Sequence, residues 1–136
     1  MVMAKRELVA ALNSGIEHEM LVYFQFYYNS LTLTGHTNMA LAEKFREESA
    51  NELVHAQKLA DRVVALGGTP SSNVPKVPRP KTPREMIKEA IKNEKTAVKL
   101  YKSILPQTKD DSVLYHLIFH ILNDELGDLE EFESLL

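Results

Sequence analysis

The stretch ESANELVHAQ, residues 48–57, places a carboxylate and an imidazole three positions apart, at Glu52 and His55. Residues at this spacing are neighbours on one face of a helix, and the rest of that face carries leucine, valine and phenylalanine at helical intervals. A carboxylate and an imidazole that share a buried face can hold divalent iron, manganese or zinc. Alone the motif is weak, because a single core histidine is more often simply hydrogen-bonded.

Three other stretches of the chain also interrupt a row of apolar residues with an acid. The interrupting acids are Glu19, Glu94, and the pair Glu125 and Asp128. Each of them lies near the middle of its expected helix, and the middles of antiparallel helices meet at one level of a bundle. We therefore expect these residues to converge as candidate metal ligands: Glu19, Glu52, His55, Glu94, Glu125 and Asp128.

The number of acids indicates how many cations the interior needs. An isolated ionised carboxylate inside a protein costs several kcal/mol, so a cluster persists only with cations or with shifted pKa values. Five or six ligands exceed the needs of one tetrahedral ion, and four carboxylates are balanced by about four positive charges. The pattern therefore favours two divalent ions over one.

Four helices position these side chains, and they are expected over about residues 5–34, 38–66, 83–106 and 111–135. The sequence GGTP supplies a glycine stop after the second helix. The sequence TPRE, residues 82–85, is a capping box with proline at the first position of the third helix. No strand pattern of comparable strength is present, so the fold class is all-α.

The connection over residues 67–82 determines the topology. It contains Pro70, Pro75, Pro78 and Pro80, and sixteen residues in an extended proline-rich conformation span about 50 Å at roughly 3.1 Å per residue. A 25-residue helix is only about 38 Å long, so this linker can run the length of the bundle and start the third helix parallel to the second. The prediction is one domain over residues 1–136, a four-helix bundle with a single long crossover.

Composition sets limits on location and partners. The chain has no cysteine, so disulfides and thiolate metal sites are excluded. The net charge of -3 does not favour nucleic acid or an anionic membrane, and the basic stretch PKVPRPKTPR has no basic tail beside it. The N-terminal stretch lacks a signal-peptide core, and no apolar run is long enough to span a bilayer. We expect a cytoplasmic protein.

Several motifs together resemble the ferritin-like di-iron carboxylate proteins, and bacterioferritin most of all. They are LNSGIEHEM, ESANELVHA, LGGTP and ILNDELGDLEEFE, and the resemblance extends over nearly the whole chain. It implies a ferroxidase that uses dioxygen or peroxide to oxidise ferrous iron for storage, in a homo-oligomer built from dimers or closed into a cage. It also implies two irons per chain, bridged by Glu52 and Glu125, with these ligands and catalytic residues: Glu19, Glu52, His55, Glu94 and Glu125.

The sequence departs from the family pattern at four places. Asp128 replaces the second histidine of the site, and Phe26 replaces a tyrosine that many ferritins carry. Leu53 stands where bacterioferritin has its haem-ligating methionine, so haem binding is doubtful. The chain ends at Leu136 without the short fifth helix of the large shells, which makes a 24-subunit cage less certain.

Asp128 changes the charge of the site. Five carboxylates against two divalent ions leave one excess negative charge, which should favour ferric iron or keep one acid protonated. The shorter aspartate should also hold its metal more weakly than histidine would. The alternative is that Asp128 is solvated on a slightly rotated helix.

Other functions remain open at this point. A rubrerythrin-like di-iron peroxidase fits the same ligands, although a chain without cysteine cannot hold a rubredoxin-type centre. A non-catalytic metal-binding assembly module fits them as well. Tyr23 and Tyr101 could donate hydrogen bonds to the ligand carboxylates, with core packing as the plainer alternative. The aromatic run over residues 23–29 is expected to place Phe24, Tyr27 or Tyr28 against a second subunit.

Overall fold

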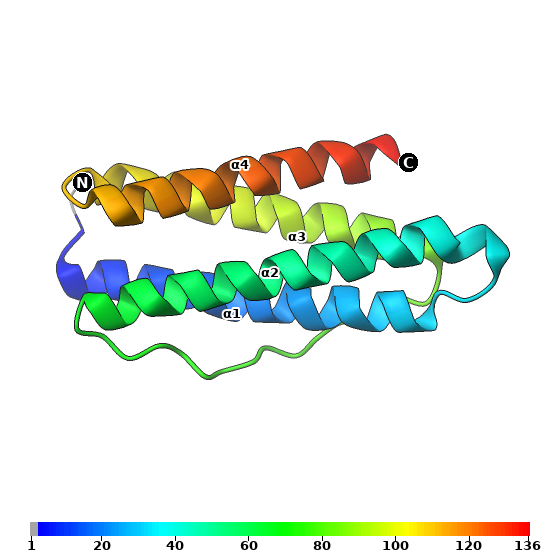
Figure 1. Cartoon of the computed structure of the whole chain (residues 1–136), viewed down its shortest axis with the longest axis horizontal. Coiled ribbons are helices and arrows are strands. Elements are labelled where there is room, and N and C mark those ends of the chain that lie inside the picture. Colours follow the sequence, from blue (N-terminus) through cyan, green and yellow to red (C-terminus); the bar gives the residue numbers. More distant parts are fainter. Residues whose placement is uncertain (1–2) are drawn as a thin grey trace.

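The computed structural model describes residues 3–136 and consists of four long helices, joined by short connections and by one long crossover between the second and third helices (Figure 1). No strand occurs in this part of the chain, which confirms the all-α prediction. In residues 3–136, no helix combines the length and the apolar character needed to cross a membrane. The helices are α1 (Lys5–Thr32), α2 (Met39–Ala65), α3 (Pro83–Ile104) and α4 (Ser112–Ser134), with single 3-10 turns at His36–Asn38 and Leu105–Thr108.

Side-chain caps and a glycine set the helix boundaries. The Thr82 hydroxyl accepts a hydrogen bond from the Glu85 amide at 3.1 Å, and the Glu85 carboxylate accepts one from the amide of Lys81, the residue before the N-cap. A variant of the expected capping box, shifted by one residue in its second bond, therefore starts α3. Asp111 caps α4 in the same way through the amide of Leu114. Gly67 adopts a φ of 83° just after α2, a conformation that residues with a Cβ rarely reach.

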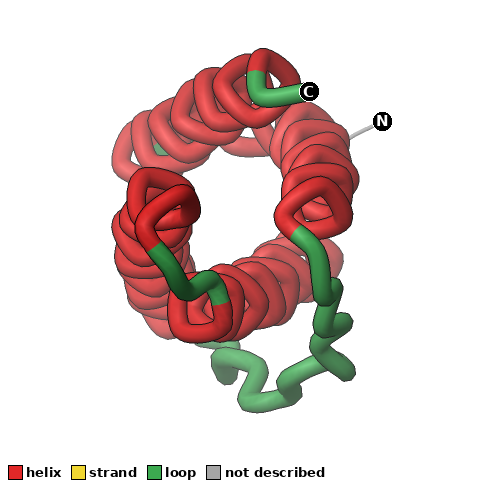
Figure 2. The backbone as a smooth tube through the Cα atoms, turned by 90° about the vertical axis from the view of Figure 1, so that its right-hand side faces the viewer, coloured by secondary structure: helices red, strands yellow, loops and turns green. Residues whose placement is uncertain are grey.

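The long crossover gives the bundle its topology. α1 and α2 are antiparallel neighbours, and the segment between α2 and α3 then runs back along the outside of the bundle (Figures 1 and 2). As a result α3 is parallel to α2, and α4 returns antiparallel to α3 (Figure 1). This is the four-helix bundle with one long crossover predicted from the proline-rich linker.

Hydrogen bonds from α1 hold the crossover against the bundle. The Asn13 side chain accepts a bond from the Ser71 amide at 2.8 Å and donates one to the Thr69 carbonyl at 3.0 Å. Further along, the buried Gln25 amide donates to the carbonyl of Pro78. An extended proline-rich segment forms no repeating backbone hydrogen bonds within itself. The side chains of Asn13 and Gln25 therefore hold the segment in its path along the bundle.

The apolar core is divided into two clusters by a layer of acids. One cluster, near the start of α1 and the end of α2, contains Leu12, Leu59, Tyr101 and Ile118 among its fully buried members. The other contains three phenylalanines whose ring centroids lie 5.2 to 5.6 Å apart, namely Phe26, Phe45 and Phe132. The buried acids come between these clusters along every helix, so apolar side chains close the polar layer from both ends.

Candidate metal centre

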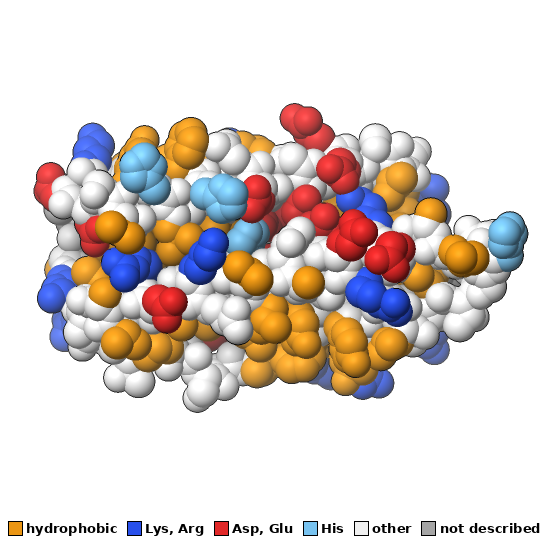
Figure 3. Space-filling view, viewed as in Figure 1, with side chains coloured by type: hydrophobic (Ala, Val, Ile, Leu, Met, Phe, Trp, Pro, Cys, Tyr) orange, Lys and Arg blue, Asp and Glu red, His pale blue; other side chains and the backbone are white. Residues whose placement is uncertain are grey.

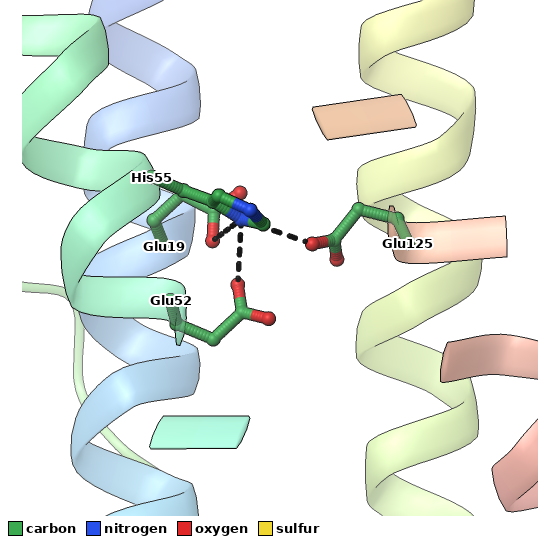
Figure 4. A group of neighbouring side chains, drawn as sticks. All are labelled: Glu19, Glu52, His55 and Glu125. Atoms are coloured by element: carbon green, nitrogen blue, oxygen red, sulfur yellow. Dashed lines mark ion pairs between the residues drawn. The ribbon is translucent and has the colours of Figure 1, made fainter. Parts of the chain in front are cut away.

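Four helices each bring a carboxylate to the middle of the bundle, and α2 adds an imidazole. Glu19 comes from α1, Glu52 and His55 from α2, Glu94 from α3 and Glu125 from α4. The three glutamates at positions 19, 52 and 94 are 0% exposed, Glu125 is 1% exposed and His55 is 4% exposed. Figure 4 shows His55 pointing toward the carboxylates of Glu19, Glu52 and Glu125. The structure therefore places these predicted residues together in the interior.

The ligand atoms form two overlapping groups. In one group, atoms of Glu19, Glu52, His55 and Glu125 lie within 4.8 Å of one another. In the other group, the same limit holds for Glu52, Glu94, Glu125 and Asp128. Glu52 and Glu125 belong to both, so each could bridge two cations. Asp128 is half-buried and lies inside the second group, rather than on a face rotated into solvent.

The two nitrogens of His55 have different surroundings. Its Nδ1 lies 3.3 Å from Glu125, 3.7 Å from Glu19 and 3.8 Å from Glu52. Its Nε2 lies 3.0 Å from the carboxylate of Asp124. A proton on Nε2 can thus be donated outward to Asp124, which leaves the Nδ1 lone pair directed at the acids. This is the tautomer that binding a metal through Nδ1 requires.

Most oxygens of the cluster have no hydrogen-bond donor. Within residues 3–136, both carboxylate oxygens of Glu52 and of Glu94 are buried without a partner, as are one oxygen each of Glu19 and Glu125 and Nδ1 of His55. Buried polar atoms are nearly always satisfied in proteins. A set of unsatisfied oxygens and one nitrogen that face one another fits hard or borderline divalent cations such as ferrous iron.

The acids shift one another's proton affinity. Burial raises the pKa of Glu52 well above its ordinary value, and the charges of Glu19 and Glu125 raise it further. Burial and the adjacent Glu125 raise the pKa of Glu94 in the same way. Glu19 behaves differently: burial raises its pKa, but the nearby Glu52, the nearby imidazole of His55 with its charge and the hydrogen bond from Tyr101 outweigh burial and lower the pKa.

His55 takes up a proton when no cation is bound. Burial works against its charged form, but the close approach of Glu125 and Glu19 and the charges of these acids raise the pKa of His55 to about 11. The imidazolium thus supplies a positive charge to the acids in the apo-protein. A cation at Nδ1 would have to replace that proton.

Glu48 and Lys44 lie near the site and were not predicted from the sequence. Glu48 is buried one turn before Glu52 on α2, next to Asp128. Burial and this neighbouring acid raise the pKa of Asp128 to about 9. Lys44, a further turn away, is bonded to Glu131 of α4 and lies 4.8 Å from the Phe132 ring centre. Glu48 falls on the same helix face as Glu52, which is the signal that could have identified it.

The family is decided by comparison with known proteins. The family model that describes a ferritin-like domain matches residues 9–136 of the chain. The chain belongs to the ferritin-like family. Two curated relatives are bacterioferritins, as the motifs indicated. The protein from Rhodobacter capsulatus is 24% identical over 131 residues, covering 94% of this chain and 81% of the relative. The protein from Brucella melitensis biotype 1 is 29% identical over 135 residues, covering 96% and 83%.

Solved structures share the fold of this ferritin-like chain. A dodecameric thioferritin, the bacterioferritin-related protein of Bacteroides fragilis, superposes with a TM-score of 0.88 at 22% identity and covers 97% of this chain and 85% of its own. The Rhodobacter capsulatus bacterioferritin, solved with a metal-free dinuclear site and haem iron, gives a TM-score of 0.87 at 24% identity, covering 98% and 85%. Both confirm the ferritin-type bundle.

The other predicted features of the ferritin-like chain fall outside the acid cluster. Leu53 is half-buried in an apolar groove between α1, α2 and the crossover, where its hydrocarbon side chain offers no axial ligand for haem iron. His116 and His120 are exposed on α4, beside its apolar stripe. Tyr27 is 42% exposed and stacks on the half-buried Tyr23, so the Tyr23 ring packs against another ring near the surface of α1.

Tyr101 hydrogen-bonds a carboxylate of the acid cluster, and the carboxylate is that of Glu19 rather than Glu94 on its own helix. Its hydroxyl donates to Glu19 Oε1 at 2.6 Å, and both residues are fully buried. Gly15 leaves room for the ring, because a Cβ at this position would lie 3.2 Å from the Tyr101 oxygen. A phenol on α3 thus fixes an acid on α1, while the position of the family's tyrosine is filled by Phe26.

We predict that Tyr101→Phe destabilises the apo-protein by about 1–3 kcal/mol, because it leaves a buried carboxylate oxygen without its donor. The measurement is urea-induced unfolding followed by circular dichroism. The matched control is Tyr115→Phe, which removes a hydroxyl from a partly exposed ring on α4 and should change the free energy of unfolding by less than about 0.5 kcal/mol. Equal effects of the two substitutions would contradict the proposed role of this hydrogen bond.

Asp124 lies between the cluster and solvent. Its carboxylate contacts His55 at 3.0 Å and His120 at 3.2 Å, and it lines a groove of about 490 Å³ between α2 and α4 that also exposes Asn123 and Asp128. In Figure 3 acidic and histidine side chains gather along this line between the two helices. The groove is the part of the surface from which an ion could reach His55.

We predict that Asp124→Ala weakens divalent-metal binding by roughly 10–100-fold, the usual loss when the carboxylate that orients a metal-binding histidine is removed. Asn123→Ala provides the control, because Asn123 lines the same groove and, within residues 3–136, makes no hydrogen bond to His55. Isothermal titration with Mn²⁺ measures both affinities. An unchanged affinity in Asp124→Ala would show that the Asp124–His55 bond does not orient the imidazole for metal.

Proposed function

We propose that this ferritin-like chain is a ferroxidase that binds two ferrous ions per chain, oxidises them and retains the ferric product. The observation that carries the proposal is the pair of overlapping ligand groups that share Glu52 and Glu125. The ligands are Glu19 and His55 on one side, Glu94 and Asp128 on the other, and the two shared acids between them. Support also comes from the two bacterioferritin relatives.

The buried carboxylates favour the oxidised state of the bound iron. Buried acids stabilise ferric iron more than ferrous iron, because an ion with one more positive charge gains more from fixed carboxylates. Two ferrous ions give up one electron each, either to dioxygen, which takes two protons and becomes hydrogen peroxide, or to peroxide, which takes two protons and becomes two waters. The excess negative charge contributed by Asp128 should strengthen the preference for the ferric state. The two apolar clusters keep bulk water away from the acid layer.

We predict that cation binding releases protons. Glu52 and Glu94 have raised pKa values in the apo-protein, and those of Asp128 and His55 are raised to about 9 and about 11. At pH 7 Asp128 and His55 hold protons that a metal must displace, so roughly two protons per chain should be released. Anaerobic titration with Mn²⁺ in buffers of different ionisation enthalpy counts them. Binding that releases no proton would contradict this assignment of the ligands.

We also propose that the protein assembles as a homo-oligomer. The aromatic run of α1 leaves Tyr27 42% exposed, and Leu31 one turn later is 52% exposed, an arrangement typical of a surface that contacts another subunit. The Bacteroides fragilis protein with the same fold is dodecameric. Size-exclusion chromatography with light scattering measures the subunit number.

One experiment separates the candidate functions. Ferrous iron is added to the apo-protein under air, and oxygen uptake, iron retained per chain and particle size are recorded. The proposal predicts oxygen consumption with iron retained by the protein. Rapid turnover with peroxide and no retained iron would favour the rubrerythrin-like peroxidase, and metal binding without oxygen consumption would favour the non-catalytic module.

A further inference from the structure

The outward face of α3 carries a row of basic side chains that takes no part in the metal centre. Its members follow one another at intervals of four, four, three, four and three positions, which places them on one face of the helix. At 1.5 Å per residue the row is about 27 Å long. We call this set the basic row, and all of its members are exposed: Arg84, Lys88, Lys92, Lys95, Lys99 and Lys102.

The charges of the basic row are not neutralised inside the chain. Within residues 3–136, none of its members takes part in an ion pair. The acids of α3 are placed elsewhere, because Glu94 is buried in the interior, Glu89 is half-buried and Glu85 accepts a hydrogen bond at the start of the helix. Like charges at these spacings repel one another along a helix, so a bound anion would relieve that repulsion.

The basic row is a local feature of a chain that is acidic as a whole. The chain has 16 lysine and arginine residues and a net charge of -3, and the row places a large share of the positive charge on one helix face. The rest of the chain is therefore more negative than the total indicates. A narrow, linear anion can follow the row, whereas a broad polyanion would also meet the negative charge around it.

The side chains beside the basic row exclude other classes of partner. No large apolar or aromatic side chain is exposed on α3, all of whose residues the structure describes. Helices that lie on a membrane bury an apolar face, and protein interfaces are enriched in aromatic residues and depleted in lysine. Single-stranded nucleic acids are bound through aromatic side chains that stack on the bases. The face offers only charge, with the polar Thr96 and Ser103 beside the lysines.

We propose that the basic row of α3 binds linear inorganic polyphosphate, with the phosphate chain lying along the helix. Lysine ammonium groups are compact charges on flexible stems, so successive lysines can each contact phosphate oxygens without a fixed geometry between them. Every contact replaces a small counterion, so the affinity depends strongly on salt. The inference does not rest on the proposed ferroxidase function, because the basic row and the acid cluster lie on different faces of α3.

The salt dependence of polyphosphate binding tests this inference. Fluorescence anisotropy of end-labelled polyphosphate measures the affinity in metal-free buffer, from about 50 to 200 mM salt. With about 0.7 counterions released per contact, six contacts give a slope near -4 for the logarithm of affinity against that of salt concentration. The combined variant Lys92→Gln, Lys95→Gln, Lys99→Gln should reduce the slope to about -2 and weaken binding by roughly tenfold or more at the lowest salt.

A matched control separates the basic row from the net charge. The combined variant Lys5→Gln, Lys58→Gln, Lys109→Gln removes three exposed lysines outside α3 and should keep the wild-type slope. Glutamine is a good helix former, and thermal unfolding establishes that both variants are folded. If the triple variant of α3 does not fold, Lys95→Gln alone should reduce the steepness of the slope by about 0.7.

Three results would overturn the proposal. Wild type that binds no polyphosphate at the lowest salt has no site for it. An equal loss in the α3 variant and in the control would show that net charge, and not the basic row, governs binding. Duplex DNA or anionic phospholipid vesicles bound more tightly than polyphosphate, at equal phosphate concentration, would assign the row to nucleic acid or to a membrane surface instead.

Discussion

Glu52→Gln should abolish ferrous oxidation and yet yield a more stable apo-protein. Glu52 belongs to both ligand groups, so its loss removes a ligand from each cation at once. The effect on metal affinity should exceed the roughly 10–100-fold loss that follows removal of an outer partner of a ligand. Initial rates of oxygen uptake after addition of ferrous iron measure the activity, with Glu43→Gln, an exposed acid of the same helix, as the control.

The gain in stability follows from the pKa of Glu52. Burial and the acids around it raise this pKa well above 4.5, so the folded state is penalised at any pH above the value for the unfolded chain. Removing the ionisable group should add about 1–3 kcal/mol to the free energy of unfolding at pH 7. The gain should disappear near pH 4, where the unfolded chain is also protonated. A variant that is less stable than wild type at pH 7 would contradict this explanation.

Cation binding should produce the largest change in thermal stability. An ion present at 1,000 times its dissociation constant stabilises the folded state by about 4 kcal/mol per site, and each kcal/mol raises the melting temperature of a domain of this size by a few degrees. Mn²⁺ without oxygen should therefore raise the melting temperature by about 10 °C or more. Adding a chelator should reverse the shift. Scanning calorimetry of apo- and Mn²⁺-loaded protein measures it.

The size of this shift should depend on pH. The folded-state pKa values of about 11 for His55 and about 9 for Asp128 lie above their ordinary values of 6.5 and 3.8. The favourable interactions of protonated His55 are lost as pH rises above 6.5, and the penalty from Asp128 grows up to about pH 9. Apo-protein should thus become less stable between pH 6 and pH 8, while metal binding strengthens. The difference in melting temperature between Mn²⁺-loaded and apo-protein should widen from pH 6 to pH 8. If it narrows, the raised pKa values of His55 and Asp128 are not its cause.

The architecture could be predicted from the sequence because local signals agreed with one another. Prolines keep the crossover extended, the TPRE sequence starts a helix, and the glycine after α2 ends one. The structure has an extended crossover, the start of α3 and the end of α2 at these places. The acid near the middle of each expected helix predicted where the polar layer crosses the bundle. The middles of helices of similar length meet at one level when neighbouring helices are antiparallel. The positions of Glu19, Glu52, Glu94 and Glu125 in space followed from that expectation.

Contacts between helices were harder to predict. Tyr101 donates to Glu19 across the bundle, and helical spacing alone shows only which residues of one helix share a face. Asp124 was missed because it lies beside the α4 stripe, where its contact with His55 depends on the distance between α2 and α4. Glu48 was on the correct face, but its importance depends on Asp128 lying opposite, which no pattern within one helix reveals.

Anomalous scattering at the iron edge tests the central claim most directly, with crystals soaked in ferrous iron in the absence of oxygen. If cations neutralise the buried acids, the map will show two iron peaks about 3.5–4 Å apart, with Glu52 and Glu125 contacting both and His55 contacting one through Nδ1. Iron found only on the outer surface, with the acid layer free of it, would contradict the account.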